Sequence, residues 1–201
     1  GVPMVPFFTF YSMFGFQRVG DSIWSAADSR ARGFLLGATA GRTTLAGEGL
    51  QHQDGHSLLL AASVPACQAF DPAFAYELGA IIEDGLIRMY GHGDPHLNED
   101  VFYYLTIYNE LYEMPPKPDH VTDADVVRGL YLWADAPDDE DAPNRATLLF
   151  SGSAQGAARE AAAELADRWG VAVDLWSATS YKRLREEALG VERRNRLHPL
   201  E

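Results

Sequence analysis

Residues 146–176 carry the pattern that most restricts the fold, because two strand-like runs flank one helical run. Residues 146–151 and 171–176 are short and apolar, whereas residues 154–169 repeat small and apolar side chains at helical spacing. Gly170 stands where a helix C-cap glycine is expected. A helix that joins two strands in this way implies parallel strands and an α/β fold class. The apolar face expected for this helix comprises Ala157, Ala158, Ala161, Ala162, Leu165 and Trp169.

The remainder of the chain alternates in the same manner. Strand-like runs are predicted at residues 5–11, 34–38, 67–70, 101–108 and 129–134. A helix is predicted over residues 13–32, with Gly33 as its stop. Asp71 followed by Pro72 is typical of a helix start, and that helix should reach about Tyr90. Residues 57–63 are apolar but too short to assign to either class. We therefore expect a mostly parallel sheet flanked by helices.

The proline-rich segment MPPKP, residues 114–118, is a stiff, extended linker by composition. We place a domain boundary there. The 201 residues suffice for one medium domain or for one and a half smaller ones. The chain opens directly on an apolar run at Gly1 without an initiator methionine, so we expect a fragment or a processed chain.

Charge and cysteine content narrow the class of protein. The formal net charge is −13, which argues against nucleic acid or an anionic membrane surface as a partner. The longest apolar runs are far shorter than the roughly 20 residues that span a bilayer. Cys67 is the single cysteine, so no internal disulfide forms, and its apolar context indicates a core residue. These features fit a cytoplasmic protein.

The glycine-rich segment GEGLQHQDGH, residues 47–56, is the densest group of reactive side chains. Its glycines let the backbone turn sharply and approach a ligand closely. Histidines such as His52 and His56 can move protons near neutral pH, and the carboxylates of Glu48 and Asp54 can tune them. On residue types alone, a catalytic loop and a solvated surface loop with hydrogen-bonded histidines remain equally open.

Three other readings compete for chemistry. Glu48, His52 and His56 are spaced by four residues and would share one helix face as metal ligands, but the glycines among them disfavour a helix. Residues 92–96 also contain two histidines and an aspartate, in a turn-rich stretch that favours a solvated loop. Residues 37–44 resemble a phosphate loop, yet lack the lysine and spacing of the nucleotide-binding fingerprint.

Several segments together resemble one enzyme family. The matching runs are YSMFGFQR at 11–18, ARGF at 31–34, GRTTL at 41–45, GEGLQH at 47–52 and DGHS at 54–57. Further runs are DPAFAYE at 71–77, YNE at 108–110, SGS at 151–153 and LHPLE at 197–201. They resemble the homodimeric bacterial type of pyruvate dehydrogenase, the decarboxylating first component of the pyruvate dehydrogenase complex. The resemblance covers essentially the whole chain and is most specific over residues 11–57.

The resemblance implies a fold and a domain plan. The fold is the thiamine diphosphate-binding, transketolase-like α/β fold. Residues 1–114 would form the later part of the pyrimidine-binding middle domain. Residues 115–201 would form the linker and the start of the carboxy-terminal domain. The family binds thiamine diphosphate between the pyrimidine-binding domain of one subunit and the diphosphate-binding domain of the other, which implies a homodimer.

The resemblance also implies roles for particular residues. Tyr11 and Phe14 would belong to the aminopyrimidine pocket, with Phe14 packing on the ring. Glu48 and His52 would be catalytic and would face the substrate, and His56 shares their loop without an assigned role. The implied reaction is oxidative decarboxylation of pyruvate with transfer of the acetyl group to the lipoyl arm of the acyltransferase component.

The chain departs from the family pattern in two respects. It lacks the Gly-Asp-Gly motif and the following asparagines that hold Mg²⁺, and the glutamate that activates the aminopyrimidine should lie upstream of Gly1. Residues 136–142 and 181–196 also fit the pattern less well. We therefore expect Mg²⁺ to be held outside this chain, and the chain alone to be inactive. A transketolase-like ketol transfer and a non-catalytic assembly module of the same fold remain as alternatives.

Overall fold

The computed structural model describes residues 4–38, 40–41, 49–91, 93–137 and 144–199. Its strands are β1 (Phe7–Tyr11), β2 (Gly33–Ala38), β3 (Cys67–Phe70), β4 (Phe102–Thr106), β5 (Tyr131–Ala134), β6 (Asn144–Phe150) and β7 (Val171–Ser177). Its α-helices are α1 (Ser12–Asp28), α2 (Ser57–Ala62), α3 (Ala75–Tyr90), α4 (Asp123–Arg128), α5 (Gln155–Trp169) and α6 (Tyr181–Leu197). Short 3-10 turns are η3 (Leu50–His52), η4 (Pro95–Leu97) and η5 (Gly152–Ala154).

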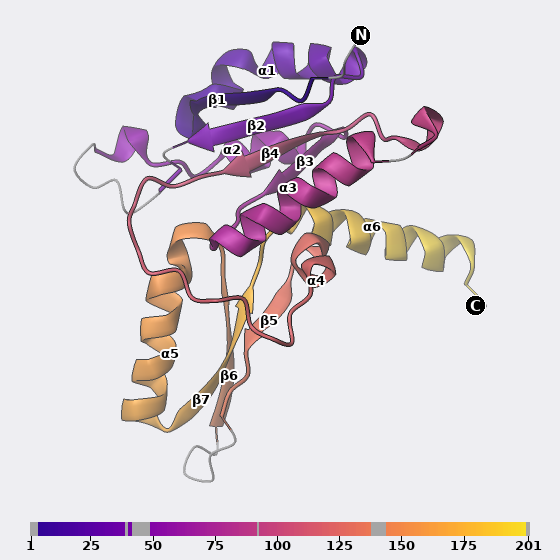
Figure 1. Cartoon of the computed structure of the whole chain (residues 1–201). Helices are drawn as coiled ribbons and strands as arrows, with labels where there is room; N and C mark the ends of the chain where they lie inside the picture. Colours follow the sequence, from indigo (N-terminus) through magenta and orange to yellow (C-terminus); the bar gives the residue numbers. More distant parts are fainter. Residues whose placement is uncertain (1–3, 39, 42–48, 92, 138–143, 200–201) are drawn as a thin grey trace.

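The described strands form two sheets, with orders β1-β2-β4-β3 and β5-β7-β6. Figure 1 shows the first sheet in the upper half of the molecule, the second below it, and α6 extending away from the body toward the C-terminus. Every strand pair of the first sheet is parallel. The predicted α/β class with a mostly parallel sheet is thus confirmed.

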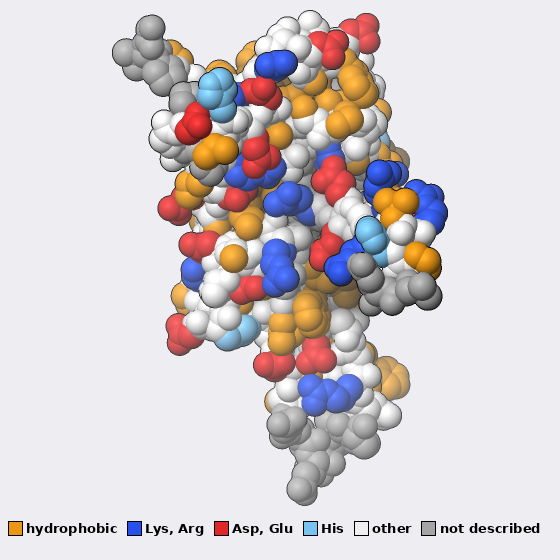
Figure 2. Space-filling model, turned by 90° about the vertical axis from the view of Figure 1, so that its right-hand side faces the viewer, with side chains coloured by type: hydrophobic (Ala, Val, Ile, Leu, Met, Phe, Trp, Pro, Cys, Tyr) orange, Lys and Arg blue, Asp and Glu red, His pale blue; other side chains and the backbone are white. Residues whose placement is uncertain are grey.

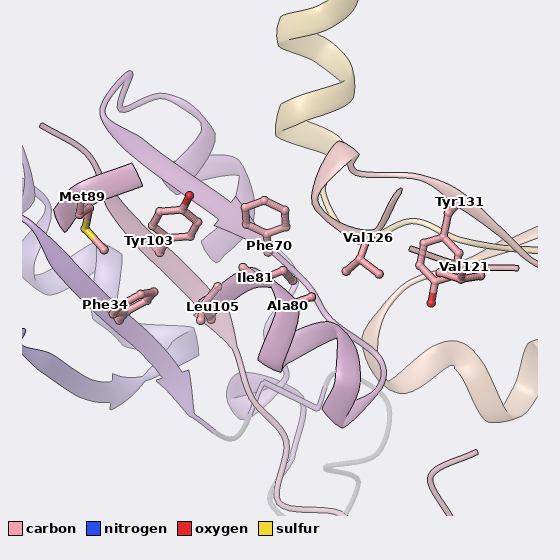
Figure 3. Close-up of a cluster of buried hydrophobic side chains, with 10 residues drawn as sticks. All are labelled: Phe34, Phe70, Ala80, Ile81, Met89, Tyr103, Leu105, Val121, Val126 and Tyr131. Atoms are coloured by element: carbon pink, nitrogen blue, oxygen red, sulfur yellow. The ribbon is translucent and has the colours of Figure 1, made fainter. Parts of the chain in front are cut away.

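Helices cover both faces of the first sheet. On one face, Ile81 and Met89 of α3 pack against Phe34, Tyr103 and other buried side chains (Figure 3). On the other face, α1 contributes Phe16 and Ile23 to a second cluster with Tyr104. Adjacent strand residues point to opposite faces of a sheet, so Tyr103 and Tyr104 belong to different clusters. This layering explains why most residues of these strands are apolar.

The second sheet contains the predicted crossover. β6 and β7 pair in parallel, joined by α5, whereas β5 lies antiparallel to β7 with an irregular register between Leu132 and Ala134. Gly170 has φ 60° and caps α5 as predicted. The predicted helix face is wrong in part, because one stripe alone contacts the sheet: Ala158, Ala162 and Leu165. The residues that miss this stripe or lie at its end are Ala157, Ala161 and Trp169, and all three are exposed.

Two helix ends differ from the prediction. α1 stops at Asp28, four residues early, since the chain turns through Arg30 with φ 56°. Gly33 does not end the helix but begins β2 with φ 148°, and a Cβ there would lie 2.7 Å from the carbonyl oxygen of Pro6. The glycine at this position serves the close approach of two backbones.

The predicted helix start at Asp71 is also wrong, because α3 begins at Ala75. The Asp71 carboxylate accepts a hydrogen bond from Thr106 Oγ1 at 2.5 Å instead of capping the helix. Glu77 accepts from the backbone N–H groups of Ala73 and Phe74 and so supplies the cap.

The periodicity of apolar residues did not assign the two short helices, α2 and α4. Residues 57–63, which the sequence left open, include helix α2. Helix α4 was not predicted, although Thr122 and Asp125 form a capping box at its start. Hydrogen bonds to Thr122 hold the pKa of the Asp125 carboxyl below its usual value.

Buried polar contacts join the two sheets. Glu77, fully buried, accepts hydrogen bonds from the Tyr131 hydroxyl and from Ser177 Oγ, each at 2.6 Å. Lys182 at the start of α6 is also buried, and its Nζ donates to the carbonyl oxygens of Val64, at 2.6 Å, and Cys67. Burial raises the pKa of the Glu77 carboxyl, and hydrogen bonds lower it again in part. The division into two domains near Met114 stays a prediction.

The surface mixes charges of both signs. Figure 2 shows acidic and basic side chains interspersed with apolar ones on one face of the molecule. Among the described residues, no helix is both long and apolar enough to cross a membrane.

Cys67 is fully buried as predicted, and burial raises the pKa of its thiol to about 12. The thiol is therefore a core group and not a nucleophile.

Candidate functional site

The candidate site lies where β1 ends and α1 begins. Tyr11 is the last residue of β1, and Ser12 starts α1 without a loop between them. Tyr11 pairs with Ala38 at the end of β2, while Gly37 pairs with Thr106 at the end of β4. The carboxyl ends of these three strands therefore share one edge of the sheet. This edge is where open α/β sheets place their ligands.

His52 reaches this edge from a distant part of the sequence. The Tyr11 hydroxyl and His52 Nδ1 lie 2.9 Å apart, so the hydroxyl donates to Nδ1 or the Nδ1–H donates to the hydroxyl oxygen. The His52 ring also meets the Tyr11 and Phe14 rings edge-on, with centroids 5.6 and 5.9 Å apart. Three of the four predicted site residues thus form one half-buried cluster.

Phe14 offers an aromatic surface beside this cluster. Its ring stacks with Tyr11 at a centroid distance of 5.5 Å, and the exposed Arg18 guanidinium lies 4.6 Å from its centroid. Next to Tyr11, Ser12 Oγ is buried and has no hydrogen-bond partner among the described residues. Aromatic faces and a nearby hydroxyl donor fit an aminopyrimidine ring.

The loop after His52 is held by a buried carboxylate. Asp54 is 4% exposed, and its Oδ1 accepts the backbone N–H groups of His56 and Ser57 at 3.1 and 3.0 Å. The His56 ring instead turns toward α1 and contacts the Gln17 side chain. Asp54 was noticed in the sequence only as a tuning group, and Gln17 was missed because nothing local links it to His56.

The structure bears on the other predictions from the sequence in different ways. Glu48 lies outside the described residues. His52 ends the 3-10 turn η3, and Gln53 after it is extended, so the described part of the loop forms no helix that could align His52 with His56. Among the described residues, no group of three His, Cys, Asp or Glu side chains could hold a metal ion. In the phosphate-loop reading, Gly37 belongs to β2, whereas residues 39 and 42–44 lie outside the described part.

A cleft opens beside this loop, between α2 and the start of α6. Its volume is about 290 Å³. The loop and α2 contribute His56 and Leu58 to it, and the second half of the chain contributes Thr179, Tyr181 and Arg185. The candidate site and this cleft therefore share the segment that follows His52.

Comparisons with known proteins identify relatives for the whole chain. Residues 2–115 match the family described as the pyruvate dehydrogenase E1 component middle domain. The chain is 55% identical over 197 residues to the pyruvate dehydrogenase E1 component of Mycolicibacterium smegmatis, covering 98% of this chain and 21% of the relative. It is 48% identical over 200 residues to that of Escherichia coli K12, covering 100% of this chain and 22% of the relative. The chain thus spans about a fifth of the length of these relatives.

Solved structures share the fold at low sequence identity. A transketolase from Campylobacter jejuni superimposes with a TM-score of 0.68 at 21% identity, over 91% of this chain and 26% of that one. A split-gene transketolase, described as an inactive β4 tetramer, superimposes with a TM-score of 0.62 at 20% identity, over 94% of this chain and 54% of that one. These similarities establish a transketolase-like fold.

Proposed function

The chain belongs to the pyruvate dehydrogenase E1 component family, and from this premise we propose that it supplies part of the active site of a thiamine diphosphate-dependent pyruvate dehydrogenase. The complete protein would decarboxylate pyruvate oxidatively and pass the acetyl group to the lipoyl arm of an acyltransferase component. The observation that carries the proposal is the cluster of Tyr11, Phe14 and His52 at the carboxyl edge of a parallel sheet.

Thiamine diphosphate supplies the carbanion chemistry and the electron sink that decarboxylation of a 2-oxo acid needs. In the proposed site, Phe14 and Tyr11 of this chain hold its aminopyrimidine ring by stacking and polar contact. Glu48 and His52 face the substrate, and Glu48 remains a proposal drawn from the sequence alone. The diphosphate and Mg²⁺ are held by residues outside this chain.

His52 has a defined task in this proposal. When the Tyr11 hydroxyl donates to Nδ1, the ring carries its proton on Nε2. Nε2–H can then donate to the substrate oxygen on which negative charge develops, as a general acid or as a hydrogen-bond donor. The edge-on contacts with Tyr11 and Phe14 restrain the ring so that this proton keeps its direction.

The proposed assembly follows from the same premise. We propose a homodimer in which a second subunit completes the site, with the lipoyl-bearing acyltransferase component as the further partner. Neither nucleic acid nor a membrane surface is a proposed partner, because the net charge is −13. We place the protein in the cytoplasm, since its single cysteine needs no oxidising compartment.

The deciding experiment measures carbon dioxide release from pyruvate by the complete protein, with thiamine diphosphate, Mg²⁺ and an artificial electron acceptor present. We expect turnover that depends on both pyruvate and thiamine diphosphate. Ketol transfer between sugar phosphates, without action on pyruvate, would instead assign the transketolase-like activity. Absence of both activities in a cofactor-loaded protein would favour a non-catalytic assembly module.

A further inference from the structure

Asp54 accepts one hydrogen bond in addition to the two that form the turn at residues 54–57. Besides the two backbone N–H groups bound by Oδ1, its Oδ2 accepts a hydrogen bond from Ser57 Oγ. Both side chains are buried, with exposed fractions of 4% for Asp54 and 1% for Ser57. The first part of this pattern is an Asx turn, which any surface loop can form. The hydrogen bond from the buried Ser57 hydroxyl is not part of an Asx turn.

The Ser57 hydroxyl connects the loop to the centre of the sheet. It accepts a hydrogen bond of 2.8 Å from the Tyr104 hydroxyl, and Tyr104 is fully buried. Tyr104 lies on β4, which is hydrogen-bonded on both sides, with Leu35 and Ala69 as its register partners. A continuous path of hydrogen bonds therefore runs from a central strand through Ser57 to Asp54.

The sheet is shaped to hold the Tyr104 hydroxyl in one place. A Cβ at Gly37 would overlap this hydroxyl, so β2 leaves room for it by carrying a glycine. The Tyr104 ring stacks on Phe10 at a centroid distance of 5.8 Å and meets Phe16 edge-on at 4.7 Å. Burial raises the pKa of the Tyr104 phenol, so the hydroxyl keeps its proton and stays a donor at neutral pH. The donor end of the path is thus fixed in place by its packing and keeps its proton at neutral pH.

His52 stands two residues before Asp54, and its ring is held from the other side by Tyr11. Tyr11 directly follows Phe10, the residue on which Tyr104 stacks. The same part of the sheet therefore fixes two segments. One is the strand that carries Tyr11, and the other is the loop that carries His52. A shift of about 1 Å in a reacting group can cost turnover about 100-fold, so such support has kinetic value.

We propose that Tyr104, acting through Ser57 and Asp54, is a positioning residue that fixes the loop carrying His52 against the sheet. The proposal rests on the function proposed above, because it gives His52 a task in turnover. None of the three residues needs to touch substrate or cofactor. Their contribution is to hold the His52 backbone where the Tyr11 contact can form.

The test compares two neighbouring tyrosines in the complete protein. Tyr104→Phe removes only the hydroxyl that reaches Ser57. Tyr103→Phe is the matched control, since Tyr103 is equally buried on the same strand but donates to Asp84 at 2.6 Å and accepts from Arg88 at 3.0 Å on the opposite face. We expect Tyr104→Phe to lower kcat for pyruvate about tenfold with less than about twofold change in KM. Tyr103→Phe should leave kcat within about twofold, although it loses two hydrogen bonds to charged groups.

A second variant and a second measurement keep the test independent of folding and of the substrate. Ser57→Ala interrupts the same path at its middle and should reproduce the kinetic effect of Tyr104→Phe. Hydrogen–deuterium exchange of residues 50–57 should rise at least about tenfold in both variants and stay unchanged in Tyr103→Phe.

The outcomes separate this proposal from the proposed function. If the wild-type protein does not act on pyruvate, the function fails, and the exchange experiment still decides whether Tyr104 anchors the loop. Equal kcat losses in Tyr104→Phe and Tyr103→Phe, or unchanged exchange of residues 50–57 in Tyr104→Phe, would overturn the positioning role. Faster exchange with unchanged kcat would overturn it as well, because the anchor would then serve the fold alone.

Discussion

Two buried carboxylates, Asp54 and Glu77, accept hydrogen bonds from the same kinds of donor group, but the donors of Asp54 are close to it in the sequence and some donors of Glu77 are far away. Each accepts two backbone N–H groups and at least one hydroxyl. The partners of Asp54 lie within three residues of it, apart from the onward link to Tyr104. The partners of Glu77 include Ser177, 100 residues away on the other sheet.

This difference in sequence distance gives the two buried carboxylates different structural roles. A buried carboxylate is costly unless its oxygens accept hydrogen bonds, and at both sites each carboxylate oxygen accepts at least one. At Asp54 the donors belong to one loop, so the bonds determine where His52 stands. At Glu77 they belong to the segment just before α3, to β5 and to β7, so the bonds determine how the two sheets meet. Changes near Asp54 should therefore alter turnover, whereas changes near Glu77 should alter stability.

His52→Ala should give the largest effect and lies on the loop side of the comparison. We expect turnover with pyruvate to fall by about 100-fold or more in the complete protein, since a proton donor is lost. Stability should fall by no more than about 1 kcal/mol, the worth of one hydrogen bond. Carbon dioxide release and the thermal unfolding midpoint measure the two quantities. An unchanged rate would remove His52 from the mechanism.

Glu77→Ala tests the joint between the sheets. It leaves the hydroxyls of Tyr131 and Ser177 and two backbone N–H groups without their acceptor, so we expect a loss of about 3 kcal/mol. Thermal unfolding and faster hydrogen exchange in β5 and β7 would report it. Glu83→Ala, on the exposed side of the same helix, is the control and should cost less than about 0.5 kcal/mol. Equal losses in both variants would contradict the role of Glu77.

Lys182→Met probes the second contact between the halves with a smaller expected loss. Methionine keeps the apolar stem but removes the ammonium that donates to the carbonyl oxygens of Val64 and Cys67. We expect about 1 to 2 kcal/mol of destabilisation, measured by thermal unfolding, with turnover per folded molecule unchanged. The exposed Lys117, paired with Asp123, provides the control Lys117→Met, which should be nearly neutral. A Lys182→Met protein as stable as wild type would remove this contact from the joint.

Glu77→Gln should give the smallest effect, and its signature is a dependence on pH. Because burial raises the Glu77 pKa above the ordinary value of 4.5, the folded state binds the proton more tightly than the unfolded state. The resulting stability is present below pH 4.5 and is lost as pH rises through the higher folded value. Glutamine cannot lose that proton, so the stability of the variant relative to wild type should rise as the pH increases above 4.5. Unfolding midpoints between pH 4 and 8 that stay parallel would refute this assignment.

The sequence was informative where a pattern is local and repeated. The crossover formed by β6, α5 and β7 is visible because a single helical period separates two apolar runs. The reading of Asp71 as a helix cap failed because a local rule was overridden by a tertiary partner, Thr106, 35 residues away. Helix α4 has six residues, too few to show a period.

The site was only partly predictable for the same reason. Resemblance selected Tyr11, Phe14 and His52, and the structure brings them together. The contact between Tyr11 and His52 spans 41 residues, so no spacing rule could foresee it. The path from Tyr104 to Asp54 spans a similar distance and depends on the space left at Gly37. A single sequence does not encode such a path in any local signal.

The parallel strand order has a consequence for the sequence of events during synthesis. β4 lies between β2 and β3 in the first sheet, yet it is the last of these strands to be made. β1 and β2 can pair with each other beforehand, but β3 has no partner in the sheet until residues up to about Thr106 have left the ribosome. The contact of Ser180 Oγ with the Ala69 carbonyl, 111 residues apart, forms later still. Closure of the sheet therefore depends on contacts between segments far apart in the sequence, which form more slowly than contacts between neighbouring strands.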